Sequence, residues 1–150
     1  MKKHVVVVLA VGLLIGADKK DEAKKELKKF QGEWVPVSVE INGKAVPEEA
    51  IKNVKVTVKG NKLTFKEGGT TIEGTFTLDP TMKPKHIDGK AKDPQGKEVK
   101  TAGIYEFDGD KLKICDSLAG GERPKKFSSK GGTPKNPITL TVYKRAKKDK

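Results

Sequence analysis

The sequence predicts an all-β protein: an antiparallel up-and-down β-barrel of about eight strands, preceded by one helix. From Gly32 onward, short segments alternate apolar and polar residues at a spacing of roughly 8–12 residues. Tight turns rich in Gly, Asn and Asp join nearly all of these segments. Only 34% of the residues are hydrophobic, and such a thin core suits one sheet curled on itself better than two packed sheets.

The first element is a targeting segment rather than part of the fold. Residues 1–4 are basic, residues 5–17 carry no charge, and the chain then turns polar at Asp18. This order predicts a secretory signal peptide over residues 1–17 and hence export to the periplasm or the medium. A helix of that apolar length spans roughly 20 Å, short of the ~30 Å hydrocarbon core. A short membrane anchor and a buried helix are the alternatives.

Residues 18–31 are expected to form an amphipathic helix. Ala23, Leu27 and Phe30 recur at i, i+4 and i+7, with Glu and Lys on the other faces. Gly32 ends the helix, and the barrel is expected over residues 32–146. Residues 147–150 are a short basic tail.

The first strand is expected over residues 34–41. Val35, Val37, Val39 and Ile41 then share one face, and Trp34 falls on the opposite face unless Pro36 introduces a bulge. The dipeptide that follows, residues 42–43, is Asn-Gly, which suits a hairpin turn with positive φ. Residues 47–52 look like a short helical turn with Pro at its first position.

The rest of the chain reads as further hairpins followed by one long loop. Strands are expected near residues 54–58, 63–65, 72–78, 86–90, 103–107, 111–115 and 138–142. A loop rich in Gly, Ser, Lys and Pro covers residues 118–137, with Phe127 on a possible short strand. The candidate interior residues are Val56, Phe65, Phe76, Tyr105, Ile114 and Leu140.

Three residues resemble a known structural signature. Gly32-Glu33-Trp34 follows the predicted helix, and Arg145 ends the last predicted strand. This pattern resembles that of lipocalins and related calycin barrels. The resemblance implies that Trp34 lies at the closed end of the barrel and that Arg145 packs over it. Such a stacked pair contributes ~0.5–2 kcal/mol through cation–π attraction.

A longer resemblance covers nearly all of the chain after the signal peptide. It is carried by residues 30–47, 55–65, 74–80, 103–115 and 122–124. These segments are similar to a small-domain family of exported proteins from planctomycete bacteria. The family has no assigned function, so the resemblance implies a fold and a location but no activity. This chain departs from the family by being very rich in Lys.

The sequence offers little for catalysis, and we assign no catalytic residue, metal ligand or cofactor. Beyond residue 17, His86 is the sole histidine and Cys115 is the sole cysteine, too few for a usual zinc site. We expect His86 on an exposed loop or strand edge and Cys115 in the core, where the alternative is a nucleophilic thiol. The Asp108-Gly109-Asp110 run is interpreted as a hairpin turn.

Charge is the dominant feature of the composition. The formal net charge is +12, and removal of residues 1–17, which contain two lysines, leaves +10. The lysines are spread along the chain, which is typical of a solvated surface but also attracts polyanions. Nucleic acid is not an expected partner, because the protein is predicted to be exported and has only five Phe, two Tyr and one Trp for stacking. We expect a monomer.

The leading functional hypothesis is an exported non-catalytic binding module that holds a small ligand inside the barrel. Tyr105, Phe107 and Arg123 are the candidate ligand-binding residues, with Asp116 or Glu106 as alternative partners for Arg123. This hypothesis requires an enclosed cavity above roughly 300 Å³. The alternative is a basic, envelope-associated domain that binds a protein or an anionic cell-envelope polymer. An enzyme with two paired carboxyl groups at the barrel mouth is the third hypothesis and the least favoured.

Overall fold

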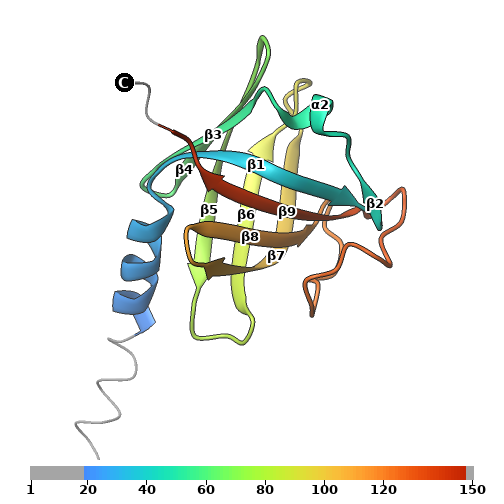
Figure 1. Cartoon of the computed structure of the whole chain (residues 1–150). Coiled ribbons are helices and arrows are strands. Elements are labelled where there is room, and N and C mark those ends of the chain that lie inside the picture. The colour runs from blue at the N-terminus through green and yellow to red at the C-terminus, as the bar shows by residue number, and fades with distance from the viewer. Residues whose placement is uncertain (1–18, 148–150) are drawn as a thin grey trace, which may run out of the picture.

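Nine antiparallel strands form one sheet that closes on itself, as Figure 1 shows for the computed structural model. The structure describes residues 19–147; the predicted signal peptide and the last three residues of the tail lie outside this range. The strands are β1 (Gly32–Ile41), β2 (Lys44–Ala45), β3 (Val54–Lys59), β4 (Lys62–Glu67), β5 (Thr70–Asp79), β6 (Lys85–Lys92), β7 (Glu98–Asp108), β8 (Lys111–Ser117) and β9 (Ile138–Arg145). Pairing of β1 with β9 closes eight of them into a barrel, which confirms the predicted fold class.

In the described range, two helices accompany the barrel. Residues 19–30 are helical and extend from the end of the barrel where β1 begins (Figure 1). The short helix α2 (Glu48–Ile51) forms where the sequence predicted a helical turn, but Pro47 is its N-cap residue and not its first helical residue. Within residues 19–147, no helix has both the length and the apolar character needed to span a bilayer.

A register shift in β1 decides which residues face the barrel interior. Trp34 pairs with Arg145 and Pro36 with Tyr143, but the next pair joins Ser38 to Val142. The extra residue at this bulge is Val37, whose side chain is 43% exposed. Of the two alternatives left open by the sequence, the structure has the one with a bulge at Pro36, and the expectation of one continuous valine face is wrong.

The main core lies at the helix-covered end of the barrel. It is formed by Phe30, Trp34, Val58, Phe76, Tyr105 and Leu112. Four of the predicted interior residues, Val56, Phe65, Phe76 and Ile114, line a cavity next to this core. The prediction for Leu140 is wrong, because Leu140 pairs with Cys115. Strand alternation puts Cys115 on the outer face, since its neighbour Ile114 points inward.

A second buried region lies outside the barrel, under the loop of residues 118–137. Ile104 and Cys115 are paired on the outer faces of β7 and β8, and both are buried. The Cys115 thiol contacts the Ser128 carbonyl oxygen at 3.4 Å. The loop therefore covers this wall of the barrel. Phe127 lies in a bend of the loop, so the short strand expected there does not form.

Strands β6 and β7 are longer than the sequence predicted. Expected boundaries were 86–90 and 103–107, whereas the two strands pair continuously from Lys85↔Tyr105 to Lys92↔Glu98. The added residues are mostly Lys, Glu and Thr, which lack the apolar alternation used to find strands. Cross-strand backbone pairing extends the hairpin beyond the apolar pattern.

Candidate functional site

The three residues of the predicted signature meet at the helix-covered end. The guanidinium carbon of Arg145 lies 4.3 Å from the centre of the Trp34 ring, which confirms the predicted stacking. Arg145 also donates hydrogen bonds to the carbonyl oxygens of Lys29 and Gln31, each at 2.7 Å. These carbonyls belong to the end of the helix, so Arg145 stabilises that end and fixes it to the barrel.

Gly32 makes this contact possible. Its φ is +113°, and a Cβ atom there would lie 3.1 Å from the Arg145 Nη1 atom. The Trp34 Nε1–H donates to the Phe30 carbonyl oxygen at 2.7 Å, so the indole is held by the helix as well. Gly32, Trp34 and Arg145 thus form a structural joint between the helix and the first and last strands.

Tyr105 and Phe107, two of the predicted ligand-binding residues, lie against the helix. The Tyr105 side chain is fully buried, and its hydroxyl donates to the Glu26 carboxylate at 3.0 Å. Phe107 packs edge-on to Phe30, with ring centres 5.1 Å apart. The structure places both residues in the packing beneath the helix, outside the set that lines the interior cavity.

Glu26 is the polar centre of this contact. Its carboxylate forms ion pairs with the Nζ atoms of Lys29, at 2.8 Å, and Lys85, at 3.3 Å. It also accepts the hydrogen bond from the Tyr105 hydroxyl. Burial raises the pKa of Glu26, but hydrogen bonds from Lys29, Tyr105 and Lys85 outweigh burial and leave the pKa below its ordinary value. Burial, followed by the bond to Glu26, raises the pKa of Tyr105 well above its usual range.

Arg123, the third predicted ligand-binding residue, has protein partners. Its guanidinium pairs with Asp88 at 2.7 Å and donates to the Gly103 carbonyl oxygen at 2.7 Å. The expected pairing with Asp116 or Glu106 is therefore replaced by Asp88, and Glu106 pairs with Lys113 at 3.1 Å. Arg123 fastens the 118–137 loop to β6 and β7.

The barrel interior contains a small apolar cavity of about 120 Å³. It is lined by Phe30, Trp34, Val56, Val58, Leu63, Phe65, Phe76, Ile87, Leu112, Ile114 and Tyr143. This volume is below the roughly 300 Å³ that the small-ligand hypothesis requires. The cavity as it stands therefore does not support a ligand of that size.

Asp116 faces the same interior, further along β8. It pairs with Gly103 on β7 and with Thr139 on β9, and the Thr139 hydroxyl donates to its carboxylate. Burial raises the pKa of Asp116 to about 6, although the hydrogen bond from Thr139 acts in the opposite direction. Burial and then the charge of Asp116 raise the pKa of Tyr143, another interior residue.

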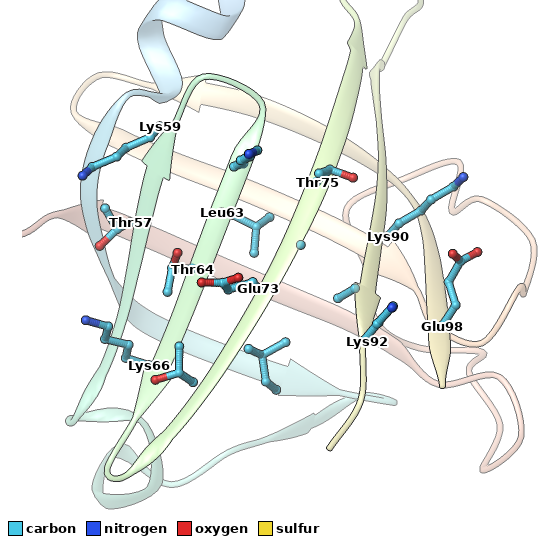
Figure 2. Close-up of a pocket in the computed structure, with 15 residues that line it drawn as sticks. Thr57, Lys59, Leu63, Thr64, Lys66, Glu73, Thr75, Lys90, Lys92 and Glu98 are labelled. Carbon is cyan, nitrogen blue, oxygen red and sulfur yellow. The ribbon is translucent and has the colours of Figure 1, made fainter. Parts of the chain in front are cut away.

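A broad concavity with a volume of about 990 Å³ lies on the outer face of the strands from β3 to β7. We call it the lysine cleft. Its lining includes Lys59, Lys62, Lys66, Lys90, Lys92, Glu73, Glu98 and four threonines, Thr57, Thr64, Thr71 and Thr75. Figure 2 shows Lys59 and Lys66 on one side of the cleft, Lys90 and Lys92 on the other, and Glu73 and Thr75 between them.

The strand register brings lysines from distant parts of the sequence into one row. Lys59 pairs with Lys62, Lys62 with Thr75, Thr75 with Lys90, and Lys90 with Lys100. We call these five residues the lysine row. Within residues 19–147, Lys59, Lys62 and Lys90 form no ion pair, whereas Lys100 lies 3.8 Å from Glu98.

The other chemically reactive candidates do not assemble. His86 pairs with Asp79 and Ile104 in the sheet and is partly buried, without a nucleophile beside it in the register. Burial raises the pKa of the Cys115 thiol, which disfavours the reactive thiolate. Among residues 19–147, no three His, Cys, Asp or Glu side chains gather in a metal-binding arrangement.

Comparison with known proteins adds no family: no family model, curated protein or solved structure matches this chain. The lysine row was missed from the sequence, and Asp116 was named there only as an alternative partner of Arg123 and not as a site in its own right. Inward alternation with Ile114 could have indicated the orientation of Asp116. Predicting the lysine row would have required the pairing register of five strands. Hairpin turns alone do not fix that register for the longer strands β5, β6 and β7.

Proposed function

We propose that the protein is a non-catalytic binding module that holds an anionic polymer in the lysine cleft. The observation that carries this proposal is the lysine row. Lys59↔Lys62 and Lys90↔Lys100 place like charges directly opposite each other on neighbouring strands. Such pairs destabilise a sheet by roughly 0.2–1 kcal/mol each. Because Lys55↔Lys66 and Lys111↔Lys144 are also lysine pairs, the feature that sets the row apart is its continuity across five strands.

The geometry favours a polymer over a small anion. The row crosses five strands, and neighbouring strands lie about 4.8 Å apart, so it extends over roughly 19 Å. The cleft holds five lysines against two glutamates, Glu73 and Glu98. Its four threonines add hydroxyl groups that donate hydrogen bonds to sulfate, phosphate or carboxylate oxygens.

The lining also favours an acidic polysaccharide of the cell envelope over a nucleic acid. No aromatic residue lines the cleft, and single-stranded nucleic acids are usually bound with base stacking on aromatic side chains. Export, which the pattern of residues 1–17 supports, would place the protein among envelope polymers. The resemblance to the planctomycete family supports the same location and adds no activity.

The test uses heparin, a linear sulfated polysaccharide, as the probe. The triple variant Lys59→Gln, Lys62→Gln, Lys90→Gln removes three charges from the row. The matched triple Lys111→Gln, Lys125→Gln, Lys144→Gln removes three exposed charges elsewhere. Binding is measured by calorimetry from about 50 to 200 mM salt, and each lost contact should lower the log–log salt slope by about one.

We expect the row variant to lose at least tenfold in affinity at low salt and the matched variant to change little. Equal losses of affinity in both variants would mean that net charge alone governs binding. That result would overturn the proposal that the polymer binds in the lysine cleft. Tighter binding to a DNA duplex than to heparin at the same salt would replace the polysaccharide with nucleic acid.

A further inference from the structure

The interior of the barrel carries a polar strip along one wall, separate from the lysine cleft. Asp116 and Thr139 are opposite each other on β8 and β9, and the pairs Ile114↔Thr141 and Leu112↔Tyr143 continue along the same strands. Ile114 and Tyr143 line the apolar cavity. Because side chains two residues apart share a face, Asp116 and Thr139 point into the same interior.

Within the part of the chain that the structure describes, Asp116 has no cationic partner. The ion pairs among residues 19–147 involve other carboxyl groups, and the hydrogen-bond donor to its side chain is the Thr139 hydroxyl. On β7, the residue opposite is Gly103, where a Cβ atom would lie 2.7 Å from the Asp116 Cβ atom. A buried carboxylate without a cation is costly, and nothing in the fold requires one here.

The cavity beside this strip sets the size of what could join Asp116. Its volume of about 120 Å³ is slightly below that of engineered apolar cavities of about 150 Å³ that bind benzene. Asp116 lies two residues beyond Ile114, so roughly 7 Å separates the two positions along β8. A chain of four or five atoms would reach from the carboxylate to the apolar lining.

We propose that the barrel interior binds a small primary amine with a short apolar tail, its ammonium group on Asp116 and its tail against Ile114 and Tyr143. The carboxylate only accepts hydrogen bonds, and the Thr139 proton is already directed at it, so the ligand must donate. A carboxylate ligand of the same length is repelled by Asp116. The partial exposure of Asp116 gives the ammonium group access to solvent.

The probe is n-butylamine, and the reporter is Trp34, which is the only tryptophan and lines the cavity. Its fluorescence is followed at pH 7.5 and constant ionic strength, with n-butanol and butyrate as matched probes. We expect a saturable change with butylamine and at least tenfold weaker responses with the other two. Asp116→Asn should weaken butylamine binding at least tenfold, and Asp108→Asn, at the exposed end of β7, should leave butylamine binding unchanged.

Three outcomes would overturn the inference: no saturable response to butylamine, equal responses to all three probes, or an unchanged response in Asp116→Asn. If Asp116→Asn does not fold, carbon NMR of the wild-type Asp116 carboxyl decides, since it should shift with butylamine and not with butanol. Heparin binding should be the same in Asp116→Asn and wild type, which separates this site from the lysine cleft.

Discussion

A carboxyl group lies at each end of the barrel interior, and the pKa values of the two groups are displaced in opposite directions. Glu26, on the barrel-facing side of the helix of residues 19–30, is surrounded by Lys29, Lys85 and the Tyr105 hydroxyl, and its pKa is lowered. Asp116, further along the interior, has a hydroxyl partner and no cation, and its pKa is raised to about 6. The helix-covered end is therefore built for stability, whereas the Asp116 end accepts a cost that stability does not explain.

The largest expected effect is at the helix-covered end. Trp34→Ala removes a fully packed indole together with its hydrogen bond to Phe30 and its stacking with Arg145. We expect a loss of about 3–5 kcal/mol in the free energy of unfolding, measured by urea denaturation with circular dichroism. A loss below about 1 kcal/mol would show that this end does not dominate stability.

The second-largest expected effect is a gain in the free energy of unfolding, at Asp116. The folded pKa of Asp116 is above its ordinary 3.8, so its protonated form stabilises the fold below about pH 4, and this stabilisation is lost as pH rises through 6. Two pKa units correspond to at most about 3 kcal/mol. Asp116→Asn should therefore gain roughly 1–3 kcal/mol relative to wild type at pH 7 and little at pH 4. An equal difference at both pH values in urea unfolding would contradict this prediction.

Glu26→Gln tests the other half of the comparison. The lowered pKa of Glu26 means that its charged form stabilises the fold above its ordinary pKa of about 4.5, and that this contribution is lost as pH falls. Because Lys29 and Lys85 are partly exposed, we expect a loss of only about 1–2 kcal/mol at pH 7. The difference from wild type should shrink towards pH 3. A Glu26→Gln protein that is more stable than wild type at pH 7 would contradict the claim that the charged Glu26 stabilises the fold.

The smallest effect concerns the lysine row. Lys62→Gln removes one member of a like-charge pair with Lys59, and should raise the free energy of unfolding by about 0.2–1 kcal/mol at low salt. The gain should fade at 1 M salt, where charges are screened beyond roughly 3 Å. Lys92→Gln is the matched control, because Lys92 is opposite Glu98 and its loss should not stabilise the protein.

Local signals in the sequence were sufficient for most of the fold. The Asn42-Gly43 turn has positive φ at both residues, and the pattern of Val54, Val56 and Val58 marks β3 correctly. Pro36 indicated the bulge that turns Trp34 inward. These predictions held because each depends on neighbours along the chain or on backbone restrictions of a single residue.

The outcomes that depend on distant packing could not be predicted in this way. Leu140 looks like a barrel-interior residue by alternation alone, but the 118–137 loop covers the outer wall and makes that face partly buried as well. Arg123 forms its ion pair with Asp88 because the 118–137 loop passes over β6. No local sequence pattern indicates this path of the loop. The row from Lys59 to Lys100 appears only when the register of five strands is known.

The hydrogen bonds from Arg145 to the end of the helix affect the order in which the protein can fold during synthesis. Residues 29 and 31 emerge from the ribosome early, yet the side chain that holds their carbonyl oxygens emerges more than a hundred residues later. Strand β1 must likewise wait for β9 before its second edge is paired. The barrel therefore cannot close, and the helix end cannot be held by Arg145, until strand β9 has been made.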